Sequence, residues 1–215
     1  MNTKKSLAVV STSALAAGMA QGSVVYSGPL NLQQIYTSGQ YRQGVSMGVS
    51  GTNDFVFGYE AGAAKPYVDA RTFVGTDPGA GGTSGIMSLL EKANTGLPVT
   101  PAGTMIDASY ATTYPAVLAG RGYMYTDDGT TVVGDWSNTA TTDAYVGIEL
   151  ALSGGTSYGW LEFIDNPGTT NLTLVDWAYQ STPGVGIETG VIPEPTAFAL
   201  GALGLAGFLA SRRRR

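Results

Sequence analysis

The stretch Gly155-Thr156-Ser157-Tyr158-Gly159 has the spacing of a nucleophile elbow, in which a serine between two glycines attacks an acyl carbon. That chemistry requires a histidine to accept the serine proton, and the sequence contains no histidine. The elbow also requires a strand, a turn and a helix, whereas this stretch is expected to connect two strands. Cysteine is missing too, which removes thiol catalysis and the usual zinc and copper ligands. We therefore expect the glycines to be turn residues, and we expect no catalytic residue, no cofactor and no enzyme activity.

Two carboxylates are enough for glycoside hydrolysis when they lie roughly 5 to 10 Å apart across a sugar-binding cleft. Glu149 and Glu162 are expected on consecutive strands and are the pair to consider. Neither lies in a Glu-x-Asp-x-Glu cluster of the kind found in jelly-roll glycan hydrolases. A solvent-facing carboxylate on a strand is therefore the simpler interpretation of each.

Asp127 and Asp128, followed by a glycine, could offer oxygen ligands to calcium, a hard cation. Asp-Gly is also a strong hairpin signal, and the regular alternation of a calcium loop is missing, so a turn is the simpler interpretation. Trp160 and Trp177 could stack on sugars, although such aromatic side chains more often fill a core. These residues are the candidates for calcium and glycan binding.

Short apolar runs separated by glycine, proline, asparagine and aspartate dominate the middle of the chain, as is typical of sandwiches and barrels. Residues 144–152 alternate most clearly, with Val146, Ile148 and Leu150 on the face predicted to be core and Glu149 on the other. The predicted strands cover residues 23–26, 30–36, 45–49, 55–59, 67–74, 114–125, 131–136, 144–152, 158–164 and 172–180.

One helix is predicted in this region, at residues 86–93, because Ser84 could cap its start, Leu89 lies on an apolar stripe and Gly96 follows its end. Residues 77–85, just before it, have the composition of a surface loop. That loop is not a phosphate-binding loop, because no Gly-Lys pair follows it.

The first residues of the chain have the order of a secretory signal peptide: two lysines, an apolar run of small residues at 6–20, and small residues at Ala20 and Gly22. We predict that signal peptidase removes residues 1–22, with a cut after Ala20 as the alternative. An uncleaved N-terminal anchor is less consistent with so short a run, rich in serine and threonine.

The charge of the chain lies mostly at its ends. Of eleven basic residues, six are in the first five positions and the last four, whereas fifteen of the sixteen acidic residues lie within residues 23–191. That region has a net charge near −10, which excludes the basic footprint of a nucleic-acid-binding protein and disfavours anionic membranes. With about 170 residues and no cysteine, it is expected to form one domain stabilised by its own core.

The C-terminal segment has three features in order: Pro193, Glu194 and Pro195, then an uncharged run at residues 196–210, then arginine at 212–215. As a helix the run would be about 22 Å long, compared with a hydrocarbon core of roughly 30 Å. Arg212, Arg213, Arg214 and Arg215 would stop translocation and keep this end cytoplasmic. We predict a short transmembrane helix that holds the preceding domain outside the inner membrane.

This arrangement resembles the PEP-CTERM sorting signal of Gram-negative bacteria. The resemblance covers about a ninth of the chain and implies recognition by exosortase, a membrane enzyme, removal of the tail, and delivery to the cell surface or extracellular matrix. The same kind of tail is also labelled as the C-terminal domain of ice-binding proteins, a label that would describe this tail and not an ice-binding face. The alternative is an ordinary C-terminal anchor that is never cleaved.

Residues 144–184 are similar to the last strands of many PEP-CTERM ectodomains, through Tyr158-Gly159-Trp160 and through an aromatic strand that ends in Thr-Pro-Gly. The resemblance implies a β-sandwich and no particular activity. We expect a signal peptide (1–22), an all-β ectodomain that is a single jelly-roll-like sandwich (23–181), a linker (182–191) and a sorting segment (192–215). The expected role is structural or adhesive; the alternative is a lectin-like module that binds extracellular polysaccharide.

Overall fold

The structure is a computed structural model that describes residues 23–35, 41–49, 53–60, 65–70, 87–92, 96–118, 121–127, 132–136, 141–166 and 171–192. Its strands are β1 (Val24–Tyr26), β2 (Leu32–Ile35), β3 (Tyr41–Val45), β4 (Phe55–Tyr59), β5 (Pro66–Asp69), β6 (Met87–Leu90), β7 (Thr100–Pro101), β8 (Met105–Ile106), β9 (Ala116–Leu118), β10 (Arg121–Tyr123), β11 (Thr126–Asp127), β12 (Val132–Val133), β13 (Thr141–Leu152), β14 (Gly155–Asn166), β15 (Asn171–Gln180) and β16 (Ile187–Glu188). Within the described residues there is one helix, α1 (Ala108–Thr113). The expected all-β character of the domain is confirmed.

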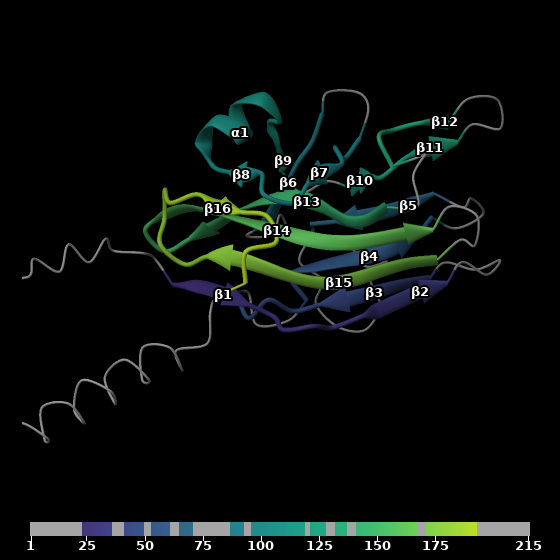
Figure 1. Ribbon diagram of the computed structural model, residues 1–215, viewed down its shortest axis with the longest axis horizontal. Coiled ribbons are helices and arrows are strands. Elements are labelled where there is room, and N and C mark those ends of the chain that lie inside the picture. The colour runs from purple at the N-terminus through teal and green to yellow at the C-terminus, as the bar shows by residue number, and fades with distance from the viewer. Residues whose placement is uncertain are drawn as a thin grey trace, which may run out of the picture.

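The larger sheet is built around three long neighbouring strands, β13, β14 and β15, which Figure 1 shows in green. Its order is β1-β15-β14-β13-β6-β9, with β2 also paired to β15 and β7 to β13. Gly154 in the turn between β13 and β14 and Gly155 at the start of β14 have φ angles of 114° and 137°, which other residues rarely adopt. Gly155 therefore fits the expected role of a turn glycine, whereas Gly159 does not, because it lies within β14 opposite Ile148.

The smaller sheet has the order β10-β5-β4-β3, and each of its described strand pairs is antiparallel. Two short pairs, β11 with β12 and β16 with β8, complete the strands. Phe57 of β4 and Phe163 of β14 meet edge to face with ring centroids 5.6 Å apart. The two sheets therefore pack face to face across one shared hydrophobic core.

Alternation along the long strands decides which side chains enter that core. Val146, Ile148 and Leu150 of β13 are fully buried in it, as predicted. On β14, Leu161 and Phe163 point into the core, so the side chains that alternate with them face away from the smaller sheet. We call that side of the larger sheet its outer face.

The outer face of the larger sheet is covered at one end by a second hydrophobic cluster. Trp160 and Tyr145 of the sheet pack there with Ile106 of β8 and Ile187 of β16. Helix α1 lies at the same end (Figure 1). Its N-cap is Asp107, whose Oδ1 accepts hydrogen bonds from two backbone N–H groups of the first turn. The sequence pattern does not predict this helix because six residues are too few to show a helical period.

The helix predicted at residues 86–93 is wrong. Met87–Leu90 is strand β6, which pairs with β13 on one side and β9 on the other. All four residues are buried, so the run has no polar face to show whether its period is that of a helix or a strand. Residues 1–22 and 77–85, predicted to be a signal peptide and a loop, lie outside the described residues.

Residues 182–191, expected to be a linker, are folded onto the domain instead. They contain β16, which pairs with β8 through Ile187 opposite Ile106 and Glu188 opposite Met105. Ile187 is 3% exposed and belongs to the cluster on the outer face of the larger sheet. The described part of the chain is therefore folded up to about Gly190, only three residues before Pro193.

Candidate functional site

Ser157, the serine of the elbow-like stretch, lies inside strand β14. It stands opposite Leu150 of β13 and is fully buried. A nucleophile elbow instead exposes its serine on a turn between a strand and a helix. The position of Ser157 therefore gives it a place in the sheet and no access to a substrate.

Glu149 and Glu162 lie on consecutive strands, as expected, and both side chains are on the outer face of the larger sheet. They are not neighbours, because Glu149 stands opposite Tyr158 and Glu162 stands opposite Tyr145. Four residues along one strand separate the two positions by about 13 Å, more than the roughly 5 to 9.5 Å between the carboxyl groups of glycosidases. Burial raises the pKa of Glu149. These two carboxylates do not form a catalytic pair.

Glu162 stands directly opposite a different carboxylate, Asp176 of β15, and we call these two residues the acidic pair. Glu162 is 8% and Asp176 5% exposed. The hydroxyl of Tyr26 on β1 donates a hydrogen bond to Asp176 Oδ2 over 2.7 Å. Burial, that hydrogen bond and the charges of both carboxylates raise the pKa of Tyr26 to about 12. The acidic pair therefore places two like charges side by side on the outer face.

The sequence does not reveal the acidic pair because it depends on the register of β14 against β15. That register shifts directly after Glu162, where Phe163 stands opposite Leu174 and Val175 is the extra residue. Such a bulge changes the direction of nearby side chains and cannot be read from alternation alone.

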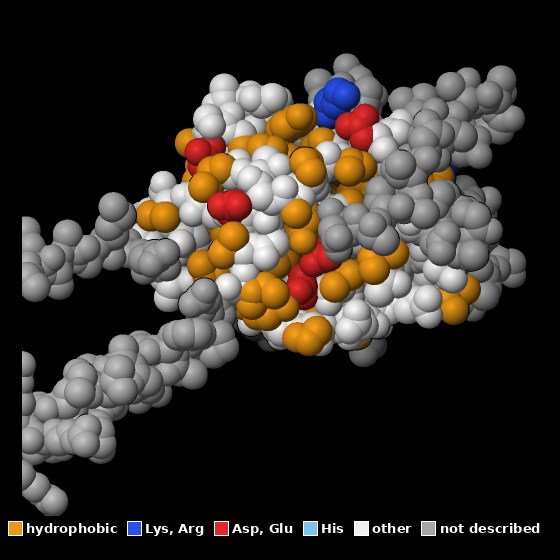
Figure 2. Space-filling model, in the orientation of Figure 1, with side chains coloured by type: hydrophobic (Ala, Val, Ile, Leu, Met, Phe, Trp, Pro, Cys, Tyr) orange, Lys and Arg blue, Asp and Glu red, His pale blue; other side chains and the backbone are white. Residues whose placement is uncertain are grey.

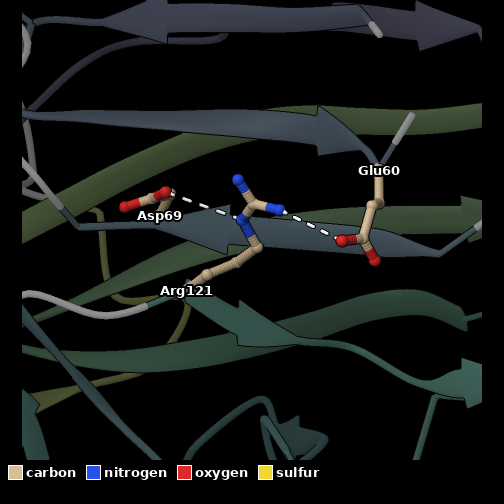
Figure 3. A network of polar contacts seen from close by, with 3 residues as sticks. All are labelled: Glu60, Asp69 and Arg121. Carbon is tan, nitrogen blue, oxygen red and sulfur yellow. Dashed lines mark ion pairs between the residues drawn. The ribbon is translucent and has the colours of Figure 1, made fainter. Parts of the chain in front are cut away.

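A second charged group, which we call the Arg121 cluster, lies on the side of the smaller sheet that faces away from the shared core (Figure 3). Arg121 of β10 lies between two carboxylates, with Nη1 3.5 Å from Glu60 Oε1 and Nε 3.7 Å from Asp69 Oδ2. Its guanidinium also covers the ring of Tyr67, 4.2 Å from the ring centroid. Asp69 is fully buried. The cluster joins β10 to β5 and to the residue that follows β4.

The tryptophans proposed as sugar-stacking residues are in the interior of the domain. Trp160 is fully buried and meets Tyr145 edge to face, with centroids 5.2 Å apart. Trp177 is 7% exposed and stacks against Tyr179 in the shared core. As they lie, neither ring offers the open face that stacking on a sugar requires.

The proposed calcium ligands fall where β11 ends. Asp127 is its last residue and stands opposite Val132 of β12, so the two strands form the expected antiparallel pair. Asp128 lies outside the described residues. Within the described part of the chain, no group of three or more histidine, cysteine, aspartate or glutamate side chains could hold a metal ion.

On the face drawn in Figure 2, acidic side chains are spread among uncharged ones, and the basic side chain that is plainly visible lies at the upper edge beside an acidic one. A described basic residue, Lys92, pairs with Asp135 over 3.6 Å, and both side chains are largely exposed. Arg121 is occupied by the cluster described above. The surface thus keeps the acidic character expected from the sequence.

Residues 182–190, which we call the strap, are held by specific contacts. Thr189 exchanges hydrogen bonds with a single turn: its hydroxyl accepts from Thr104 N–H at 2.9 Å and donates to the Pro101 carbonyl at 2.8 Å. Its own N–H donates to the Thr104 carbonyl at 2.9 Å. Gly190 has φ 77°, and a Cβ there would lie 2.9 Å from the Tyr145 hydroxyl. The strap is therefore a fixed part of the domain and ends where the sorting residues begin.

The residues predicted to carry sorting, Pro193 to Pro195 and the four terminal arginines, lie outside the described residues. No described helix is long and apolar enough to cross a membrane. The helix expected at residues 196–210 lies outside the described residues.

Comparison with known proteins identifies the segment that follows the strap. Residues 191–215 match the PEP-CTERM protein-sorting motif. The search of curated proteins and the search of solved structures gave no match. The chain therefore carries a motif that indicates export and sorting to the cell surface. It is a PEP-CTERM domain-containing protein, and its tail makes it a substrate for sorting by exosortase.

Proposed function

We propose that this protein is a structural or adhesive component of the cell surface or extracellular matrix of a Gram-negative bacterium. The sorting motif at residues 191–215 is the observation that carries this proposal. The two sheets that share one core support a single β-sandwich of jelly-roll type as the exported domain. The buried position of Ser157 and the wide separation of Glu149 from Glu162 support a role without catalysis.

The tail acts in three steps in this proposal. Signal peptidase removes residues 1–22 after export. The apolar helix at residues 196–210 then anchors the protein transiently in the inner membrane, and Arg212–215 resist transfer across it. Exosortase finally cuts near Pro193-Glu194-Pro195 and releases the domain to the surface.

Mass spectrometry of the protein from wild-type cells tests this order of events. The mature C-terminus is expected close to Pro-Glu-Pro, without the arginines. Changing Pro193, Glu194 and Pro195 to alanine should trap a full-length, membrane-bound form and empty the matrix fraction. Changing Arg212–215 to serine should let the weakly apolar helix slip through, with the tail retained, whereas lysine at the same four positions should restore processing.

A mature wild-type protein that ends at Arg215, with the alanine variant in the same location, would reduce the tail to a plain anchor. The proposed role of the domain would then lose its main support, since nothing would direct the domain to the matrix.

The second candidate function is binding of extracellular polysaccharide. Partly exposed aromatic rings at α1 support it, because Tyr110 and Tyr114 lie together with centroids 4.6 Å apart. A glycan array probed with the mature protein, with and without calcium, separates the two functions. Binding that is lost in Tyr114→Ala, with the fold kept, would favour the lectin-like role; Trp160→Ala is instead expected to unfold the domain.

A further inference from the structure

The chain leaves the folded domain at a defined point. Four hydrogen bonds at Thr189 tie the strap to residues 101–104, the last of them from Gly103 N–H to the Thr189 carbonyl at 3.0 Å. Val191 N–H donates to the Glu188 carbonyl at 3.3 Å. Only Val191 and Ile192 then remain before Pro193. The place of exit is thus fixed by the fold and not by a free linker.

Three exposed apolar side chains belong to the last described residues and to β8, the strand that pairs with the strap. Val191 is 43% and Ile192 51% exposed, and Met105, which stands opposite Glu188 in the β8–β16 pair, is 49% exposed. These three are among the five large hydrophobic side chains exposed in the described part of the chain; the other two are Ile35 and Ile164. We call Met105, Val191 and Ile192 the exit patch.

The distance from the patch to the sorting residues is short. An extended chain advances at most about 3.6 Å per residue, so Pro193 lies within roughly 7 Å of Val191. An enzyme that grips the chain on both sides of a bond near the triplet must therefore meet the surface of the folded domain. Val191 and Ile192 also belong to the matched motif at residues 191–215, so whatever reads the motif reaches part of the patch.

We propose that the exit patch is a docking surface for the extracytoplasmic face of exosortase. The proposal rests on the processing described under the proposed function. The apolar side chains would pack into a small apolar depression of the enzyme and position the Pro-Glu-Pro triplet for cleavage. The strap makes this possible because it fixes the point at which the chain leaves the folded domain.

Charge favours a protein partner over a lipid surface. Residues 96–118 and 182–192 contain no lysine or arginine, and they do contain Asp107 and Glu188. Hydrogen bonds from the Ser109 side chain and from the backbone of α1 lower the pKa of Asp107, so this carboxylate is ionised at neutral pH. An acidic surface of this kind is repelled by anionic lipids.

The test compares two exposed apolar residues in the full-length chain inside cells that contain exosortase. Met105→Ser should slow conversion of the full-length to the mature form at least about fivefold, because it removes an apolar contact at the interface. Ile35 has a similarly exposed side chain but lies on β2, outside the strap and the strand that pairs with it. Ile35→Ser should therefore leave the rate of conversion unchanged. Circular dichroism melts of both variants check that the fold is kept. Equal rates for both variants would overturn the proposal.

A spacer sharpens the test. A flexible Gly-Ser insert of about six residues between Ile192 and Pro193 separates the triplet from the patch. It should slow processing to the rate of Met105→Ser, and adding Met105→Ser to it should have no further effect. An insert that is processed at the wild-type rate would show that the patch is not used.

Two other occupants of the patch would also overturn the proposal. If the mature protein floats with phosphatidylcholine vesicles and the Met105→Ser form does not, the patch binds lipid. If Met105→Ser converts a dimer to a monomer in size-exclusion chromatography, the patch binds a second copy. Failure of the proposed function is separate, because in that case the wild-type chain itself is not cut.

Discussion

The Arg121 cluster and the acidic pair bury carboxylates in opposite ways. Each lies on the side of its sheet that faces away from the shared core. In the Arg121 cluster, the buried Asp69 and the partly exposed Glu60 flank one guanidinium. In the acidic pair, Glu162 and Asp176 stand opposite each other, and the hydroxyl of Tyr26 is a donor to Asp176. The first arrangement places a cation between two carboxylates, whereas the second places two carboxylates directly opposite each other.

This difference shows what each cluster contributes to the protein. A buried carboxylate beside a cation is stable only while the cation stays, so the Arg121 cluster holds three strand regions in place. Two carboxylates directly opposite each other on neighbouring strands repel, and this repulsion between Glu162 and Asp176 opposes folding. Stability should therefore fall when the first cluster is changed and rise when the second is relieved.

The largest expected effect comes from Arg121→Met, which keeps the aliphatic stem and removes the charge. Asp69 would then remain buried without this cation, and the free energy of unfolding should fall by about 3 kcal/mol at neutral pH. Urea titration followed by circular dichroism measures it. The matched control is Lys92→Met, because the Lys92–Asp135 pair is exposed on both sides and should contribute at most about 0.5 kcal/mol. Equal losses in the two variants would show that burial of Asp69 does not set the effect.

The sequence predicts the strands of both clusters better than it predicts the clusters. Strand β4 has the predicted bounds, and β13, β14 and β15 extend the predicted ones, because alternation is a local property. The Arg121 cluster requires β10 to lie beside β5, and the acidic pair requires the shifted register between β14 and β15. Pairing and register are set by the whole chain, so neither cluster is visible in a short stretch of sequence.

The C-terminal region shows the same limit. Its sorting motif is readable because a proline-flanked glutamate, an apolar run and four arginines follow each other within one short segment. The strap just before it has a linker-like composition, yet Ile187 and Thr189 are buried against residues far earlier in the chain. Residues that are adjacent in the sequence therefore predict how the protein is sorted, whereas contacts between distant residues determine where the folded domain ends.

A smaller effect of opposite sign is expected from Asp176→Asn. The change removes one of two facing charges, keeps an oxygen that can accept from Tyr26, and adds an amide that can donate to Glu162. The free energy of unfolding should rise by about 1 kcal/mol at neutral pH. Urea titration at neutral pH measures this, with the exposed Asp135→Asn as control. A loss of stability at neutral pH would instead show that the charged acceptor of the Tyr26 hydrogen bond outweighs the repulsion within the pair.

The smallest effect appears at alkaline pH and connects Tyr26 to the acidic pair. Burial, the hydrogen bond to Asp176 and the nearby carboxylate charges raise the pKa of Tyr26 from 10.0 to about 12. The folded state therefore keeps this proton after the unfolded state has lost it, so the contribution of Tyr26 is complete below pH 10 and is lost as the pH rises towards 12. Because Tyr26 is partly exposed, we expect its share to be about 0.5 kcal/mol.

Tyr26→Phe should flatten the fall in stability between pH 10 and 12 by that amount, as measured by urea titration at several pH values. Burial also raises the pKa of other tyrosines, Tyr158 among them, so the wild-type fall is larger than the share of Tyr26 alone. The informative comparison is therefore Tyr26→Phe in the wild-type and in the Asp176→Asn background. If Asp176 is part of the cause, the second difference must be smaller than the first, because the charged acceptor is gone. Equal differences would mean that Asp176 does not contribute, and that burial and the charge of Glu162 raise the pKa of Tyr26.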